Sequence, residues 1–426
     1  MAEKTRAQSA DVIAVSVTRR ELMGRRVGVH VLLLGVMLAS AAATTRVAEG
    51  QEPGRPARQA IGNGTVSLDV YAHGAVLDLL TTTREGASLE LRHRRSTDGG
   101  ESWSAEHLID TSNQPISIAS RGNEPQVVSH ADHVTVHWST TGASRFGAGP
   151  MVSAVSHDAG RTWKPGPRPT NSPGDVAENF ADMTADPDGV FYVAWVGSHD
   201  GPAGRALGLA RSTDFGETWG HSQLVDTSSC ACCWNKMIAP RSGAVRVLYR
   251  DHDIRDMALV STDDAGEHWS LDGTVGRFDW EFPGCPHVGG GIAVTEDDGG
   301  EQLHALVWTG REERQGLYWL RSDDDGATWS DPRPMGVDLS RHADLGAVGR
   351  TVVAAWDDSR AIWVSVSHDL GERWTEPRRV SVEGVVASHP IVIGTVDAFR
   401  LFWTERVGGG RMHWRSRRLG MEATAS

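Results

Sequence analysis

All four cysteines of the 426-residue chain stand in two short segments that could bind a metal. Cys230, Cys232 and Cys233 form a Cys-x-Cys-Cys group, and Cys285 stands in the tripeptide Cys285-Pro-His287. Thiolates and imidazole are ligands that copper and zinc prefer, so these five residues predict a soft-metal site. Two disulfides that pin the loops are the alternative. In that case Cys232 and Cys233 bond to different partners, because a bond between adjacent cysteines is strained.

Three histidines form a second set of candidate ligands. His287, His342 and His389 each stand shortly before a strand-like segment, in the contexts Cys-Pro-His, Ser-Arg-His and Ala-Ser-His-Pro. Because these strand-like segments recur along the chain, the three positions are expected to meet at one end of the fold. Imidazole is a common metal ligand, so the three side chains extend the metal hypothesis. Solvated or hydrogen-bonded loop histidines are the alternative.

Charged loops supply candidates for a site that works without a metal. Arg250, Arg311 and Arg360 stand at nearly equivalent places just beyond strand-like segments. A planar guanidinium group binds a carboxylate through two hydrogen bonds, so these residues predict a site for an acidic ligand. Asp251 and Arg255 belong to the same loop as Arg250. A solvated rim of charges is the alternative, because connecting loops run over the surface.

One eight-residue motif recurs six times and supplies elements that position these loops. Each copy begins with Ser or Thr, has Asp at its third place and Gly at its fifth, and ends in Trp. In a hairpin turn the Asp and hydroxyl side chains bond backbone amides, Gly adopts a left-handed conformation and Trp packs beneath the turn. We therefore predict a structural role for these Asp-boxes, which are residues 96–103, 156–163, 212–219, 262–269, 322–329 and 367–374.

Strand-like segments between the boxes repeat with a regular length. Those that end in an aromatic residue are 134–138, 191–195, 245–249, 303–308, 352–356 and 399–403, and their ends are 47 to 59 positions apart. This interval fits one four-stranded blade with its loops. With the first hairpin strand, 75–80, the units number seven. We predict an all-β fold, a single β-propeller over residues 61–420, with seven blades as first choice and six as second.

The cysteine, histidine and arginine loops all belong to the propeller face opposite the box turns. That face surrounds the channel mouth, where we expect a small-molecule or glycan ligand. Residues 42–60 are predicted to be a flexible linker, or a segment that closes the ring by supplying the outer strand of the last blade. Closure would hide sheet edges that an open array exposes.

The amino-acid composition limits the classes of partner that this protein can bind. Forty-two basic and 55 acidic residues give a formal charge of −13, which repels phosphate backbones and argues against a nucleic-acid partner. Glycine (48) and tryptophan (16) are abundant, which suits short strands and tight turns. Nothing in the sequence specifies an oligomeric state, and a monomer is the default.

Residues 1–41 have the residue pattern of an export signal. Four arginines at 19, 20, 25 and 26 precede the apolar run 27–38 and the small-residue triplet 39–41, a pattern that predicts a cleaved leader and no membrane span in the mature chain. Residues 18–23 resemble a twin-arginine motif, whereas a start at Met23 would leave an ordinary secretory leader. Either leader predicts a periplasmic or secreted protein, where thiols oxidise unless a metal holds them.

The boxes resemble those of the sialidase superfamily, the Asp-box or BNR-repeat propellers. The resemblance covers the mature chain at the level of the boxes, and it is closer to exo-α-sialidases at residues 94–104 and 121–125. It implies a secreted glycoside hydrolase that hydrolyses or binds acidic glycans. The Cys-x-Cys-Cys loop, the loop 249–256 and Gly284-Cys285-Pro286 together resemble a group of bacterial sialidase-like proteins.

The same resemblance implies catalytic roles for particular residues. Sialidases bind the substrate carboxylate with three arginines, and Arg250 and Arg311 match two of them. Tyr249 is the best-placed tyrosine for a nucleophile, and Glu85 is the carboxylate in the loop where the family places its acid/base. The Arg-Ile-Pro motif that opens the first sialidase blade is missing here. A metal-binding or redox propeller and a non-catalytic interaction scaffold therefore stay as alternative functions.

Overall fold

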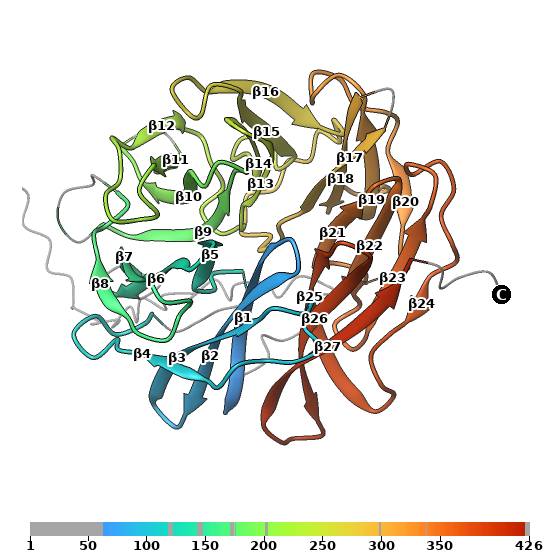
Figure 1. Ribbon diagram of the computed structural model, residues 1–426. Coiled ribbons are helices and arrows are strands. Elements are labelled where there is room, and N and C mark those ends of the chain that lie inside the picture. Colours follow the sequence, from blue (N-terminus) through green and yellow to red (C-terminus); the bar gives the residue numbers. More distant parts are fainter. Residues whose placement is uncertain are drawn as a thin grey trace, which may run out of the picture. The chain divides into compact units, whose positions relative to one another are not determined.

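Short β-strands form all the regular secondary structure of the described residues, which contain no helix (Figure 1). The computed structural model describes residues 63–117, 122–142, 148–170, 174, 176–200, 203–297, 300–337 and 339–421. The all-β prediction is confirmed for these residues. The predicted leader, the linker 42–60 and Arg121 lie outside them. No helix in the described ranges has the length and apolar character needed to cross a membrane.

Twenty-seven strands follow one another in seven consecutive sets. The first three sets are β1 (Gly64–His73), β2 (Val76–Glu85), β3 (Ser88–Ser96) and β4 (His107–Ile109), then β5 (Gln126–His130), β6 (His133–Thr141), β7 (Ala148–Ser156) and β8 (Lys164–Gly166), then β9 (Glu178–Ala185), β10 (Phe191–Ser198), β11 (Arg205–Ser212) and β12 (Gln223–Asp226). The others are β13 (Lys236–Arg241), β14 (Ala244–Arg250), β15 (Met257–Thr262) and β16 (Ser270–Val275), then β17 (Gly291–Asp297), β18 (Gly300–Thr309), β19 (Gly316–Ser322) and β20 (Arg333–Met335), then β21 (Ala343–Val348), β22 (Thr351–Asp357), β23 (Ile362–Ser367) and β24 (Arg378–Arg379), and finally β25 (Val385–Gly394), β26 (Ala398–Val407) and β27 (Met412–Gly420).

Hydrogen bonding joins the strands of each set in chain order. Five sets, from β5–β8 to β21–β24, are separate four-stranded antiparallel sheets. The first and last sets share one seven-stranded sheet of order β25-β26-β27-β1-β2-β3-β4. Its two halves meet through a single parallel pair, Gly64 with Met412, which the N–H of Met412 strengthens by donating to the carbonyl of Asn63 at 2.8 Å.

Each set buries its apolar side chains against the next, and the last set packs against the first. For example, Leu207 of β11 shares a hydrophobic cluster with Val245 and Val247 of β14. At the seam between the two ends of the chain, Phe402 of β26 packs with Leu68 of β1. Seven such clusters cover the seven junctions. Burial of apolar surface between neighbours is the main term that stabilises such an array.

The six Asp-boxes are the turns between the third and fourth strands of the first six sets, and they share one hydrogen-bond pattern. In the third, the Ser212 hydroxyl donates to Asp214 at 2.7 Å and accepts from the N–H of Gly216 at 2.7 Å. Asp214 also accepts from the N–H of Thr218 at 2.8 Å. Gly216 has a φ of +88°, in the left-handed region that glycine adopts without strain.

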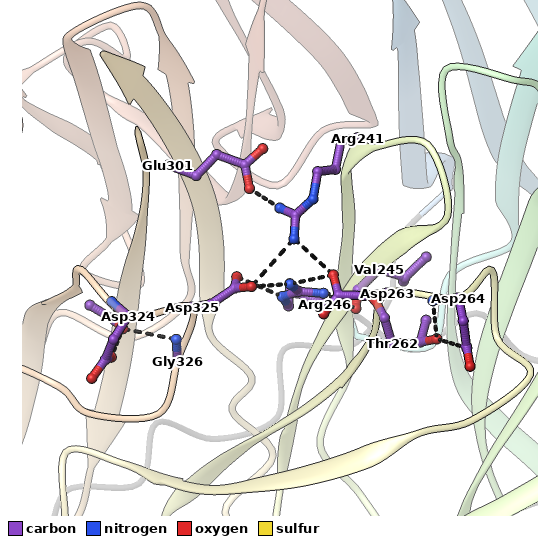
Figure 2. A network of polar contacts seen from close by, with 11 residues as sticks. Arg241, Val245, Arg246, Thr262, Asp263, Asp264, Glu301, Asp324, Asp325 and Gly326 are labelled. Atoms are coloured by element: carbon purple, nitrogen blue, oxygen red, sulfur yellow. Dashed lines mark hydrogen bonds and ion pairs between the residues drawn. The ribbon is translucent and has the colours of Figure 1, made fainter. Parts of the chain in front are cut away.

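Ion pairs and charged hydrogen bonds connect neighbouring boxes. Figure 2 shows Arg246, which is 0 % exposed, between the boxes of the fourth and fifth sets. Its guanidinium group donates to Asp325 at 2.5 and 3.0 Å and to Asp263 at 2.9 Å. Arg241 adds a contact to Asp263 at 2.8 Å and an ion pair with Glu301. All the charges of this cluster are therefore paired within the fold.

Candidate functional site

One cavity collects residues from all seven sets, each on the first strand of its set or in the loop just before it. It encloses about 610 Å³, including the open space at its mouth. Its lining combines an aromatic ring, two imidazoles, an ammonium group and several carboxylates, which is the mixture of polar and apolar groups that small-ligand sites use. The polar and aromatic lining residues are Asp69, Glu124, Gln126, Asp182, Trp234, Asn235, Lys236, His342, Asp344 and His389.

Three aspartates on first strands connect each of their sets to the next. Asp69 of β1 accepts from the N–H of Val127 at 2.8 Å. Asp182 and Asp344 accept in the same way from the N–H groups of the following first strands, at 2.5 and 2.9 Å. The lining carboxylates therefore hold neighbouring sets together as well as setting the charge of the cavity.

Burial changes how these groups titrate. Burial, reinforced by the negative charge of Asp182, raises the pKa of Asp69 to about 7. Burial likewise raises the pKa of Asp182 to about 6. Lys236 lies 3.7 Å from Asp344. Burial alone would lower the pKa of Lys236, but the surrounding carboxylates outweigh it and raise that pKa. Lys236 therefore stays positively charged, whereas the cavity loses negative charge as the pH falls toward 6 and Asp69 takes up a proton.

His342 and His389 stack on each other beside a buried carboxylate. Their ring centroids are 3.8 Å apart with an interplanar angle of 17°. Asp357, at the end of β22, is 0 % exposed and lies 2.9 Å from Nδ1 of His342. It also accepts from the backbone N–H groups of His389 at 2.7 Å and Ser359 at 3.1 Å. Burial alone would raise the pKa of Asp357, but the charge and hydrogen bonds of these partners lower it.

The Asp357 contact selects one tautomer of His342. An ionised carboxylate only accepts hydrogen bonds, so Nδ1 of His342 carries the hydrogen and Nε2 of the neutral ring carries the lone pair. A buried carboxylate that orients an imidazole in this way is the arrangement that general bases and metal-bound histidines use.

Trp234 lies beside the three predicted histidines and packs closely against two glycines. Its ring centroid lies 5.7 Å from that of His342, 6.0 Å from that of His389 and 6.1 Å from that of His287. A Cβ on Gly122 or Gly289 would come within 2.3 or 2.2 Å of the indole, so neither position has room for a side chain. The structure thus gathers the three histidines around one tryptophan.

The four cysteines lie in one cluster, in which Cys230, Cys232 and Cys233 are buried and Cys285 is partly buried. Cys232 and Cys285 form one of the two disulfides of the alternative hypothesis, whereas Cys230 and Cys233 are thiols and form no second one. The Sγ atom of Cys230 lies 3.4 Å from that of Cys233 and 3.8 Å from that of Cys232. Contact with Cys233 lowers the pKa of Cys230 to about 6, and burial raises the pKa of Cys233. Nδ1 of His287 contacts the carbonyl oxygen of Cys232 at 2.9 Å.

The predicted arginine site has a different environment from the one expected. Arg250 is 1 % exposed, and its guanidinium group donates to the carbonyl groups of Val288 at 3.0 Å, Trp308 at 2.9 Å and Arg255. Arg255 is 8 % exposed and donates to the carbonyl of Phe282 at 3.1 Å. Both side chains therefore hold loop backbone, and neither lines the cavity.

The other predicted catalytic residues also lie away from the cavity lining. The hydroxyl of Tyr249 donates to Asp226 at 2.6 Å, and burial with that carboxylate raises the pKa of Tyr249. Asp251 is half-buried, and burial raises its pKa. Arg311 donates to the carbonyl groups of residues 278 and 279. Glu85 is exposed at the end of β2 and pairs with Arg411.

A family model described as a BNR repeat-like domain matches residues 78–331, which is more than half of the chain. This chain belongs to the BNR repeat-like family. The resemblance to Asp-box, sialidase-like proteins is thereby confirmed for the fold of this BNR repeat-like protein. No curated protein matches the sequence.

Solved structures with similar folds include enzymes that act on polysaccharides. An ulvan lyase of polysaccharide lyase family PL25 is 12 % identical, with a TM-score of 0.58 over 85 % of this chain and 95 % of that one. The polysaccharide lyase Uly1 is 12 % identical, with a TM-score of 0.56 over 89 % and 94 %. The Hadza microbial sialidase Hz136 is 17 % identical, with a TM-score of 0.45 over 70 % of this chain, which spans 63 % of the length of that sialidase. At these identities the likeness concerns the fold alone.

Sequence reasoning missed the cavity carboxylates, although the sequence carries a signal for them. Leu68-Asp69-Val70, Ala181-Asp182-Met183 and Ala343-Asp344-Leu345 place an aspartate between apolar residues in three first strands. An aspartate at the same place in three of the seven sets indicates a shared environment for these first strands. Asp357 and Lys236 carry no such pattern, and only the folded chain shows their role.

Proposed function

We propose that this BNR repeat-like protein is an exported enzyme that binds an acidic glycan in the cavity and cleaves it. The seven strand sets are the seven blades of one propeller over residues 61–420, and the cavity is its channel mouth. Support for the propeller comes from the seven packed junctions and from the family match. Support for a glycan comes from the two polysaccharide lyases, whose fold resembles this one over most of both chains.

The observation that carries the proposal is that His342, which lines the cavity with Trp234 and Lys236, contacts the buried Asp357. Each group has a place in saccharide chemistry. An indole ring packs on the apolar face of a sugar, and an ammonium group attracts a uronate or sulfate. A neutral imidazole held by a buried carboxylate accepts a proton at its second nitrogen.

These groups fit a β-elimination better than the hydrolysis that sialidases perform. In a uronic acid, the imidazole of His342 would remove the proton next to the carboxylate, the C–O bond to the leaving sugar would break, and a C=C bond would form. Lys236 would stabilise the charge that develops on the carboxylate. Asp69, whose pKa is about 7, is partly protonated near neutral pH, and in that form it would donate a proton to the leaving oxygen. No arginine lines the cavity among the described residues, so a sialidase-type arginine triad has no counterpart there.

The test offers the protein three substrates: oligosaccharides with the unit that one ulvan lyase structure contains, -[GlcA(1-4)Rha3S]-, a simple polyuronate and a fluorogenic sialoside. Ultraviolet absorbance reports the unsaturated uronate of an elimination, and new reducing ends without that absorbance report hydrolysis. We expect absorbance to rise with a uronate substrate and to be lost in His342→Ala. If the protein neither binds nor cleaves any of the three substrates, the proposal is contradicted.

A further inference from the structure

The four cysteines lie close together and outside the lining of the proposed glycan cavity. They come from the loop before β13 and the loop before β17, and none of them lines the cavity. Cys230 and Cys233 are each 1 % exposed, and Cys232 is 7 % exposed. Phe180 and Val196 belong to the same hydrophobic cluster as these three cysteines. Such a pocket excludes water, which favours sulfur ligation over hydrated ions.

The spacing of the sulfur atoms fits one small ion. The Sγ atoms of Cys230, Cys232 and Cys233 all lie within 4.8 Å of one another. With zinc–sulfur bonds of about 2.3 Å, the sulfur atoms of a tetrahedral site are about 3.8 Å apart. The separations of 3.4 Å from Cys230 to Cys233 and 3.8 Å from Cys230 to Cys232 are close to that value. Cys285, which the disulfide joins to Cys232, is the candidate for the fourth sulfur ligand.

Buried positive charge beside the cluster suits a site with a negative charge. Four thiolates around a divalent ion carry two net negative charges, which are costly in an apolar interior. Arg250 and Arg255, both buried, interact electrostatically with Cys230. The N–H of Cys230 also donates to the carbonyl of Arg250 at 2.9 Å. Arg250, which the sequence assigned to a substrate carboxylate, thus acts electrostatically on Cys230 together with Arg255.

We propose that reduction of the Cys232–Cys285 disulfide converts this cluster into a closed four-thiolate site for a thiophilic d¹⁰ ion, zinc or copper(I). A dithiol reductant supplies the two electrons and two protons that turn the disulfide into two thiols, and is itself oxidised to a disulfide. The ion then displaces the thiol protons as the four sulfur–metal bonds form. With all four positions taken by sulfur, the ion has no open place for a substrate, so it stabilises the loops that hold Trp234 and His287.

The first measurement uses the full-length protein, reduced under anaerobic conditions with a dithiol and desalted. Thiols are counted after denaturation, and Co²⁺ is titrated as a spectroscopic substitute for zinc. We expect four thiols, one Co²⁺ per chain and the intense visible bands of tetrahedral sulfur coordination. Zinc and a copper(I) complex then compete for the site, and the ion that displaces Co²⁺ at the lower concentration is the one the site prefers.

Variants separate ligation from folding. Cys233→Ser is expected to weaken Co²⁺ binding by more than about 100-fold, since even outer-shell changes cost metal sites about 10- to 100-fold. Thr227→Ala, a change in the same loop outside the sulfur cluster, should bind as the wild type does, and circular dichroism confirms that both variants fold. His287→Gln should keep the sulfur spectrum.

Three outcomes overturn the inference. The first is a reduced protein with four counted thiols and no tetrahedral Co²⁺ spectrum. The second is equal binding by wild type and Cys233→Ser. The third is a disulfide that resists native reduction, so that only two thiols are counted.

Discussion

Two histidine–aspartate pairs, one in an Asp-box turn and one at the cavity, differ in how far they are shielded from water. His268 lies 2.7 Å from Asp264 in the fourth Asp-box, and their side chains are 90 % and 45 % exposed. His342 lies 2.9 Å from Asp357 in the cavity, and these side chains are 19 % and 0 % exposed. The distances are similar, but only the second pair is shielded from water. A shielded pair keeps one geometry and a strong interaction, whereas an exposed pair competes with solvent.

The contrast extends to the neighbours of each pair. In each box the Asp at the third place closes its own turn, and other box carboxylates, such as Asp263 and Asp325, pair with arginines such as Arg246 (Figure 2). In the cavity, carboxylates with raised pKa values, an ammonium group and an indole ring line one space. Repetition therefore marks the residues that build the fold, and the residues proposed for catalysis stand outside the repeated motif.

The largest expected effect compares the two histidines directly. His342→Ala should lower kcat on the uronate substrate by roughly 10²- to 10⁴-fold, the usual contribution of a positioned base. His268→Ala should leave kcat unchanged, because its ring touches only its own turn. Steady-state kinetics of both variants, with thermal melts to confirm folding, measure the difference. Equal losses in the two variants would remove the distinction between the two pairs.

The next effect tests the charge of the cavity. Asp69→Asn keeps an acceptor for the N–H of Val127 but removes a carboxylate whose folded pKa is about 7. Because this pKa is raised, the folded wild type binds the proton more tightly than the unfolded chain does, and its stability falls as the pH rises from about 4 to about 7. The variant should be more stable by roughly 2–4 kcal/mol at pH 8 and show no gain near pH 4. Urea unfolding of both proteins at both pH values measures this difference. A difference in stability that is the same at pH 4 and pH 8 would contradict the prediction.

A smaller effect is expected from a box. Ser212→Ala removes the hydroxyl that accepts from the buried N–H of Gly216. Leaving such a group unsatisfied costs about 1–3 kcal/mol. Urea unfolding should show this loss, while kcat at low temperature stays at the wild-type value. A box variant that keeps its stability and loses turnover would mean that the boxes take part in the chemistry.

The smallest effect concerns the aromatic wall of the cavity. Gly289→Ala places a Cβ where the Trp234 indole now lies, and Gly220→Ala, whose Cβ meets nothing closer than 3.5 Å, is its control. Displacing the ring should raise KM roughly three- to tenfold with little change in kcat, since an aromatic contact is worth about 0.5–1.5 kcal/mol. A KM that is unchanged in Gly289→Ala would remove Trp234 from the binding surface.

The sequence predicts the repeated part of this molecule better than its cavity. The six boxes, the all-β fold and the convergence of two cysteine loops all follow from motifs and their spacing. The arginine site does not follow, because a sequence cannot show whether a guanidinium group donates to a ligand or, like that of Arg250, to backbone carbonyls. The partner of His342 stands 15 residues later at the end of the next strand, and only strand pairing brings the two together.

The measurement that most directly tests the central claim is chemical labelling of histidines with and without a bound acidic oligosaccharide. Diethyl pyrocarbonate modifies accessible imidazoles, and mass spectrometry reports the extent at each residue. We predict that a glucuronate-containing oligosaccharide protects His342 and leaves the labelling of His268 unchanged. Equal labelling of His342 with and without the oligosaccharide, or protection of His268 instead, would contradict a glycan site in this cavity.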